Sequence, residues 1–485
     1  MSIVRGNPHA RTVDTTLLVL TAGVALFVAP LAAATGTKGV LLLLGLAAVV
    51  VIAAKPHWGA YLYLLMTPLI VGIARNDSVP IRPNEALLGL FVVGVGARVV
   101  VLSLRGRAER MAIHRVELAI LLMAVSASLI PLTLRYARGL PISADDLLYA
   151  AVLWKYCIVF RVFREAVRSP EQVAICLKLS LISAAVVGVV AVLQVRNLFG
   201  VPEFLSIYYD DPFSSDSGAG SDRGTSTIAS SFGVADVMSM NLAVVLAMVA
   251  KGHSRSAPLL VVGCVLLFGC IASGQFSGLI GLIIVTGSVL WLGLHVRRLL
   301  IYIISGGIAG MLALWPVLAE RLKGFETLGG LPTSWTGRLN NLQQVIWPEL
   351  FTGWNWLLGV RPAARIPAPE PWREWIFIES GYTWLLWTGG LPLLLAFGFF
   401  VRCSLRELRA VMREAADPVS TVSVATFSWL IAMTMLMLLD PHLTIRGSAD
   451  LFFPFLALST TAPILAAAAT TRGASEEAIA KSATT

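Results

Sequence analysis

The polar residues best placed to do chemistry lie in the last third of the chain, beside long apolar stretches. Arg338 opens a short segment, Thr336 to Trp347, with apolar residues on one helical face and amides on the other. Its guanidinium and the free N–H groups of a helix start could bind an anion. Glu379 stands at the edge of the next apolar stretch, where a carboxylate could accept a proton from a hydroxyl group. Each also has a plain structural interpretation, as a solvated arginine at a helix start and as the polar end of a helix.

Tryptophans are concentrated in the same region. Eight of the thirteen in the chain fall between Trp335 and Trp387, and Trp347 closes the amphipathic segment. Tryptophan is enriched where a membrane meets water. Its ring also stacks on sugars, so two interpretations stay open: an interfacial belt and a glycan-binding surface.

The composition shows which kind of element must position these residues. Of 485 residues, 57% are apolar and 13% are charged, about half the charge of an ordinary soluble domain. The net charge of +9 is spread over short connections between apolar stretches, which does not favour nucleic-acid binding. We expect a single membrane domain over residues 1–470, with a disordered cytoplasmic tail over 471–485.

Apolar runs of helical length recur along the whole chain, which predicts an all-α transmembrane bundle of about fourteen helices. A large loop, 319–377, precedes the last three of them and contains the amphipathic segment, which should lie flat on the membrane. The expected spans are 14–34, 39–54, 57–74, 84–104, 116–132, 143–162, 172–194, 232–250, 257–273, 277–294, 299–318, 378–401, 420–439 and 450–470.

Arginines cluster in alternate gaps between these spans, notably around 105–115, 161–168 and 402–413. By the positive-inside rule these gaps are cytoplasmic. Both termini should therefore be inside, and the two long gaps, 195–231 and 319–377, should face outward.

Charge inside the expected spans is scarce. The charged residues noted there are Arg98, Lys155 and Lys178, and each is near enough to a cytoplasmic end to extend its charged group to the membrane surface. An ion pump would normally have carboxylates near the middle of its helices, so the scarcity of charge argues against one. The chain has no nucleotide-binding fingerprint and no zinc motif, so neither a cofactor nor a metal is expected. The adjacent pairs Asp145-Asp146 and Asp210-Asp211 suit turns or helix caps better than a shared metal ion.

Several motifs in the last third occur in a set order. Gly337-Arg338 is followed by Trp347, then by Leu357-Leu-Gly-Val360, and then by Glu379-Ser-Gly-Tyr with Gly-Gly-Leu391 at its end. This order resembles the O-antigen ligase and Wzy-type polysaccharide polymerase superfamily. The family has one large outer loop before its final three helices, and the expected spans agree with that.

Two upstream segments extend the resemblance. The run from Arg223 to Phe232 is similar to an arginine-containing outer loop of the family. The segment Ser273 to Gly278 is similar to a Thr-x-Ser-Arg-Gly turn, but Gln275 stands where the family often has arginine.

The resemblance implies transfer of a glycan from a polyprenyl diphosphate to an acceptor hydroxyl on the outer face. Arg223 and Arg338 would hold the diphosphate, because a guanidinium pairs with phosphate oxygens and keeps its charge. Glu379 would act as the base.

Further contacts are expected around these groups. Tyr382, one turn along the same helix face, would orient the sugar or Glu379, and Trp347 would contact substrate. His442 and Arg446, in the last outer gap, are reserve candidates for the base and for phosphate contact. A connector role for that gap is equally open.

The family's ligases usually have histidine at the position of Glu379, so the glutamate favours a polymerase. Transfer to a lipid or protein acceptor, as in the ligases, is the first alternative. A flippase for lipid-linked glycans and a non-catalytic envelope scaffold are the others. In each case we expect a bacterial inner-membrane protein, with polysaccharide export or flippase proteins as possible partners.

Overall fold

The computed structural model describes residues 37–74, 81–106, 113–209, 223–253, 257–292, 296–323, 333–368 and 375–461. These residues form helices almost throughout, because each long apolar run satisfies its backbone hydrogen bonds within itself. The helices are α2 (Thr37–Ala54), α3 (His57–Ile70), α4 (Pro83–Leu104), α5 (Arg115–Ala137), α6 (Ala144–Ala150), α7 (Val152–Ala166), α8 (Pro170–Val195), α9 (Val201–Tyr208), α10 (Ser231–Met248), α11 (Ala257–Ala272), α12 (Phe276–Trp291), α13 (Val296–Ala313), α14 (Trp315–Lys323), α15 (Thr333–Asn341), α16 (Trp347–Leu350), α17 (Asn355–Leu358), α18 (Gly381–Glu414), α19 (Val419–Leu436) and α20 (Ser448–Ser459).

The helices are of the kind that a membrane protein requires. Six of the described helices are long and apolar enough to cross a bilayer, and five more are apolar but shorter. The expected all-α membrane bundle is therefore found, whereas the described residues do not establish fourteen crossings. The first expected span, 14–34, the end of the last one, and the tail 471–485 lie outside the described residues.

Three expected spans are divided or displaced in the structure. The span 299–318 is divided at Leu314 into α13 and α14. The span 143–162 is divided at Ala151 into α6 and α7, and α6 starts at a capping box formed by Ser143 and Asp146. The span 378–401 starts later, because Ser380 is the N-cap of α18 and its hydroxyl accepts from the Thr383 amide. Glu379 therefore precedes the helix, so it does not share a helix face with Tyr382 as expected.

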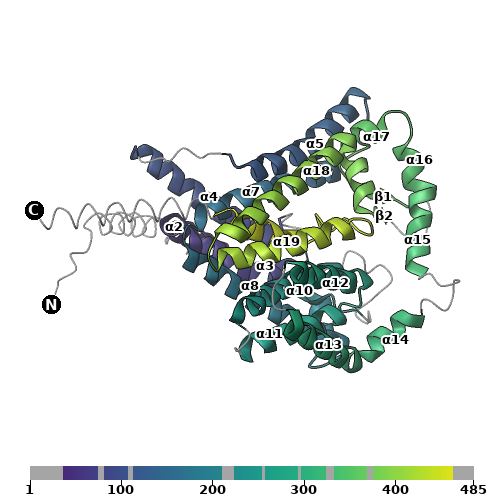
Figure 1. The fold of residues 1–485 in the computed structure, drawn as a ribbon. Helices are drawn as coiled ribbons and strands as arrows, with labels where there is room; N and C mark the ends of the chain where they lie inside the picture. The colour runs from purple at the N-terminus through teal and green to yellow at the C-terminus, as the bar shows by residue number, and fades with distance from the viewer. Residues whose placement is uncertain are drawn as a thin grey trace, which may run out of the picture.

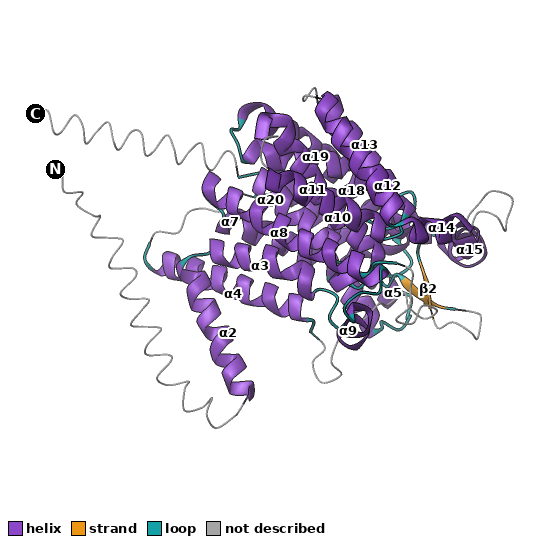
Figure 2. Ribbon diagram, turned by 90° about the horizontal axis from the view of Figure 1, so that it is seen from below, coloured by secondary structure: helices purple, strands orange, loops and turns teal. Residues whose placement is uncertain are grey.

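The core of the bundle is formed by α10, α19 and α20. Nearly all of their residues are buried, whereas only 28% of the apolar window of α4 is buried. Figure 2 shows α10 and α19 inside the bundle, with α2 and α13 at opposite margins. Three buried hydroxyls in α19 and α20, those of Ser423, Thr426 and Ser459, each donate to a carbonyl oxygen four residues earlier.

The loop region lies at one end of the bundle, where α14, α15 and α16 stand apart from the long helices (Figure 1). A π-turn, Leu342–Ile346, joins α15 to α16. The expected amphipathic face is found in part: Leu342 and Ile346 are buried, but Leu339 is 44% exposed. The region also contains a short antiparallel hairpin of β1 (Arg365–Pro367) and β2 (Trp375–Phe377), which the sequence did not predict.

Two adjacent aspartates of α6 fix this loop to the bundle. Arg361 contacts Asp146 through Nε and Nη2 at 2.8 and 3.0 Å, and Arg365 contacts Asp145 at 2.6 Å through both nitrogens. Asp146 also accepts from the Ser143 amide. The interpretation of Asp145-Asp146 as a capping pair is therefore confirmed for Asp146, while Asp210-Asp211 lies outside the described residues.

The prediction of scarce charge inside the helices was wrong. Lys155 does not snorkel: its Nζ lies 2.8 Å from the buried Asp450 carboxylate. The Tyr63 hydroxyl donates to the same carboxylate at 3.2 Å. Asp236 is also buried, inside α10. Asp236 lies within an apolar run, where averaging hydropathy over a long window conceals it, and Asp450 is the third residue of α20.

Candidate functional site

The candidate site is built around Arg338, in α15. Its Nη1 donates to Asp440 Oδ2 at 3.0 Å, and its Nε lies 3.5 Å from Glu379 Oε1. The guanidinium also lies over the ring of Phe232, 5.5 Å from the centroid. Four segments far apart in the sequence therefore meet at one side chain: the start of α10, α15, the residue before the N-cap of α18, and the segment after α19.

Packing between α18 and α19 brings Glu379 close to Asp440. Gly381, the first residue of α18, lies against Met437, where a Cβ would be 2.5 Å from the methionine sulfur. The Tyr382 amide donates to the Met437 carbonyl oxygen at 3.2 Å. A side chain at position 381 would therefore push the start of α18, and Glu379 with it, away from the segment that carries Asp440.

Asp440 has an unusual environment for a carboxylate. Its side chain is 7% exposed, and Arg338 is the charged group in contact with it. Burial raises the pKa of the Asp440 carboxyl above its ordinary value, although Arg338 and His442 oppose this effect. If Asp440 is protonated, Glu379 is the remaining carboxylate that pairs with Arg338.

A second pair lies two residues further along the chain. His442 Nδ1 lies 2.9 and 3.0 Å from the two oxygens of Asp236, and both side chains are almost completely buried. Burial disfavours the charged imidazole, but the Asp236 carboxylate outweighs this and raises the pKa of His442. Within the described residues, His442 Nε2 has no hydrogen-bond partner.

These contacts form a row of alternating charge: Glu379, Arg338, Asp440, His442 and Asp236. Three carboxylates face one guanidinium and one imidazole, so the row carries a net negative charge even when His442 is protonated. A carboxylate held in this way suits acceptance of a proton from a hydroxyl. A phosphate group, in contrast, would have to compete with Asp440 for Arg338.

Backbone contacts show where the remaining two predicted arginines lie in the fold. Arg223 precedes Gly224, whose amide donates to the Ala272 carbonyl oxygen at 2.8 Å, and so it lies at the turn between α11 and α12. Arg446 lies in the same segment as His442, and its carbonyl oxygen packs against Gly233 of α10.

Gln275, in the turn that departs from the family pattern, is close to the site. Its side-chain amide donates to Ser231 Oγ at 2.6 Å, next to the Phe232 ring that lies under Arg338. An uncharged residue at this position adds no positive charge to the row.

Two of the predicted substrate contacts have structural partners. The Trp347 indole donates to Thr383 Oγ1 at 3.4 Å, which joins the loop helix to the first turn of α18. The Tyr382 hydroxyl donates to the Thr434 carbonyl oxygen of α19 at 2.9 Å, not to Glu379. Both interactions position the start of α18.

Asp236 and Asp440 were not assigned a role from the sequence. Asp236 could have been found, because a lone acidic residue in an apolar span is by default a functional candidate. Asp440 gave no such signal, since it lies in a polar connection where an aspartate is ordinary. Among the described residues, no group of three or more histidine, cysteine or acidic side chains is arranged to hold a metal ion.

No protein-family model matches the chain, and a search of curated proteins returns no match.

Proposed function

We propose that this protein is a membrane glycosyltransferase that joins glycan units carried on polyprenyl diphosphate, at the outer face of a bacterial cell membrane. The acceptor is a second lipid-linked glycan, as in a polymerase. The proposal includes an orientation with both termini in the cytoplasm, which puts the α15–α16 loop and the row of charges outside.

One observation carries the proposal: Arg338 contacts both Glu379 and Asp440. Arg338 and Glu379 were selected from the sequence as an anion-binding group and a base, and 41 residues separate them along the chain. Their meeting at the loop end of a membrane bundle supports a reaction centre at that end. A solvated arginine and an unrelated helix end would not require such a contact.

In the proposed reaction Glu379 takes the proton of the acceptor hydroxyl. The acceptor oxygen forms a bond to the anomeric carbon of the donor glycan, and the bond from that carbon to the diphosphate oxygen breaks. The diphosphate leaves with the electron pair and remains attached to its polyprenyl chain. The side chain of Glu379 is 30% exposed, so a hydroxyl can reach it.

Positive charge must balance the departing diphosphate. Arg338 is shared with Asp440, so we assign it to holding Glu379 in place as well as to phosphate contact. We assign the further charge that the proposal needs to Arg223, at the turn between α11 and α12, and to Arg446, four residues after His442. Asp236 acts through His442, as a positioning residue for the segment that carries Asp440.

The test is a set of single variants in the native host, with the surface polysaccharide separated on a gel. Arg338→Ala, Arg223→Ala, Glu379→Gln and Asp440→Asn should each abolish long chains, and loss of a general base costs about 10²–10⁴-fold in rate. Glu203→Gln, which alters an exposed carboxylate on α9, is the control and should leave the chains unchanged.

The pattern on the gel also distinguishes polymerase from ligase. A polymerase defect leaves single repeat units on the acceptor, whereas a ligase defect leaves long chains that are not joined to it. Normal ladders in the Arg338 and Glu379 variants, at normal protein levels, would contradict the proposed function.

A transporter of lipid-linked glycans is the second candidate, and the buried Lys155–Asp450 pair favours it. Ionisable groups inside a membrane protein often mark a transport or proton pathway. For a transporter, Lys155→Met with Asp450→Leu should stop movement of a lipid-linked glycan across vesicles of the purified protein. For the transferase, movement should be absent in wild type as well.

A further inference from the structure

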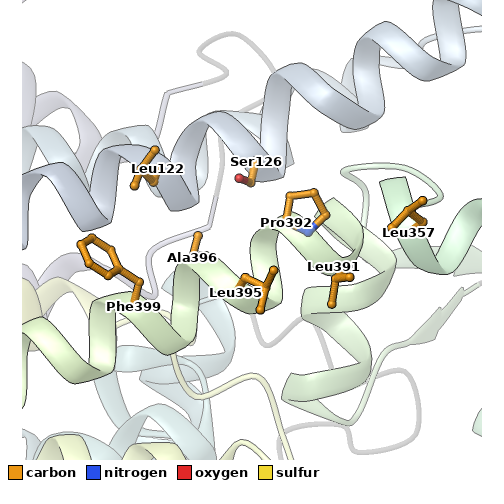
Figure 3. Close-up of a pocket in the computed structure, with 8 residues that line it drawn as sticks. All are labelled: Leu122, Ser126, Leu357, Leu391, Pro392, Leu395, Ala396 and Phe399. Atoms are coloured by element: carbon orange, nitrogen blue, oxygen red, sulfur yellow. The ribbon is translucent and has the colours of Figure 1, made fainter.

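An apolar groove runs between α5 and α18 (Figure 3). It is open on one side and has a volume of about 450 Å³. Ser126 supplies the one polar side chain of the lining, which includes Leu122 of α5, Leu357 of α17, and Pro392, Leu395 and Phe399 of α18. This volume is within the range of ligand sites in proteins.

The backbone conformation of α18 at two glycines shapes the groove. Gly390 has φ 64° and ψ −158°, which breaks α18 into two segments at an angle. Gly389 lies directly on α5, where a Cβ would be 2.6 Å from the Ser126 carbonyl oxygen. The groove begins at this close contact and follows the second segment of α18 along α5 (Figure 3).

The groove opens away from the protein. The side chains at its rim are substantially exposed: 43% for Leu122, 64% for Leu395 and 40% for Phe399. In a membrane such a surface faces the acyl chains of lipids.

Exposed aromatic residues mark the end of the groove near α17. Tyr136, Phe351, Trp354 and Trp356 are 79%, 62%, 65% and 39% exposed. Exposed aromatics of this kind collect at headgroup depth. The interfacial belt that the sequence left open is therefore the better interpretation for Trp354 and Trp356.

Arg138 lies near these aromatic residues, and its hydrogen-bond partner is an uncharged amide. Its Nη1 donates to the Asn355 amide oxygen at 2.7 Å, two residues before the groove-lining Leu357. The aspartates of this region are engaged by Arg361 and Arg365. Within the described part of the chain, Arg138 has no carboxylate partner.

We propose that the α5–α18 groove binds one membrane phospholipid with an anionic headgroup. An acyl chain occupies the groove and the phosphodiester pairs with the Arg138 guanidinium. One arginine matches the single charge of a phosphodiester, and a diphosphate would bring more charge than Arg138 balances. The lining of α18, from Leu391 to Phe399, is about 12 Å long at about 1.5 Å per residue, which suits part of an acyl chain. The site does not depend on the proposed function.

The test uses the full chain in nanodiscs of equimolar phosphatidylglycerol and phosphatidylcholine, with retained lipids counted by native mass spectrometry. Wild type should retain one phosphatidylglycerol in preference to phosphatidylcholine. Arg138→Gln should reduce that preference about fivefold. Ala396→Trp, which fills the groove, should abolish retention.

Matched controls separate this site from general lipid contact. Arg196→Gln alters another arginine at a helix end that donates to a neutral oxygen, and Val93→Trp adds an indole on the exposed side of α4. Both should retain the lipid as wild type does. If Ala396→Trp does not fold, Ser126→Leu narrows the groove with a smaller change.

Three results would overturn the inference: equal retention by Arg138→Gln and wild type, equal retention of the two phospholipids, or displacement of the retained lipid by added undecaprenyl diphosphate. The last would assign the groove to a lipid diphosphate instead. None of these results depends on glycan transfer, which the Glu379→Gln variant tests separately.

Discussion

Arg338 has two carboxylate partners, which limits what it can do for a phosphate. The contacts with Glu379 and Asp440 hold the guanidinium in one orientation and neutralise its charge. A diphosphate clamp made of Arg338 and Arg223 alone, as the resemblance implied, would therefore be weak. The geometry assigns Arg338 mainly to positioning the base. For that reason we assign part of the phosphate contact to Arg446.

At the scale of single residues, the His442–Asp236 pair predicts a pH-dependent stability. The pKa of His442 is raised in the folded protein, so the folded state holds this proton more tightly than the unfolded state does. The stabilisation is complete below the ordinary histidine pKa of about 6.5 and is lost as the pH rises through the raised value. We expect the pair to contribute about 2 kcal/mol at low pH.

Thermal unfolding in detergent checks this prediction. Asp236→Asn with His442→Gln removes both charges and keeps similar volumes. The difference in stability between wild type and this double variant should be largest near pH 6 and should shrink toward pH 9. A difference that is constant with pH would show that His442 does not carry the proton.

At the scale of elements, the kink in α18 can be tested at one glycine. The φ and ψ of Gly390 are almost exclusive to glycine, and a Cβ there would lie 2.3 Å from the Leu357 carbonyl oxygen. Gly390→Ala should destabilise the protein by more than about 3 kcal/mol, since strain and a backbone clash add.

Gly398, eight residues further along α18, is the control. It is exposed, and a Cβ there would meet nothing within 4 Å. Gly398→Ala should stabilise the helix by up to about 1 kcal/mol. Equal unfolding temperatures for the two alanine variants would contradict the kinked geometry of α18.

The elements that the sequence predicted best are those whose apolar runs have clear ends. The span 172–194 corresponds to α8, Pro170–Val195, because Ser169 caps its start. The kink at Gly390 and the division at Ala151 were not predicted. Gly389, Gly390 and Pro392 mark the kink in the sequence, and the close approach of Gly390 to the Leu357 carbonyl oxygen of α17 accompanies it. The division at Ala151 has no structural explanation.

The site was predictable only residue by residue. Arg338 and Glu379 could be selected because each lies at the edge of a recognisable segment. Their shared partner Asp440, and the Asp236–His442 pair, depend on how α10 packs against the segment after α19. Pairs separated by about a hundred residues or more leave no trace in a single sequence.

At the scale of the whole molecule, α18 predicts the sidedness of the protein. The apolar part of α18, from Gly381 to Val401, is about 31 Å long at about 1.5 Å per residue, which is enough to cross a bilayer, and the arginine-rich part from Arg402 to Glu414 continues beyond it. Its start, with Glu379, and its end, with Arg413, should therefore lie on opposite sides of the membrane. The proposed orientation puts Glu379 outside.

Cysteine labelling of intact cells checks this orientation in a variant without the five native cysteines. Thr352→Cys, in the turn between α16 and α17, should react with a reagent that does not cross the membrane. Arg413→Cys should react only after the cells are opened. Both positions are exposed, so a lack of labelling cannot be ascribed to burial.

The most direct measurement is turnover by the purified protein in nanodiscs, supplied with one lipid-diphosphate-linked glycan and no nucleotide sugar. Wild type should form products of two or more units and release polyprenyl diphosphate. Glu379→Gln should be at least about 100-fold slower, while Glu203→Gln should match wild type. Equal rates for Glu379→Gln and wild type, or no joined product from folded wild type, would contradict a reaction centre at Arg338 and Glu379.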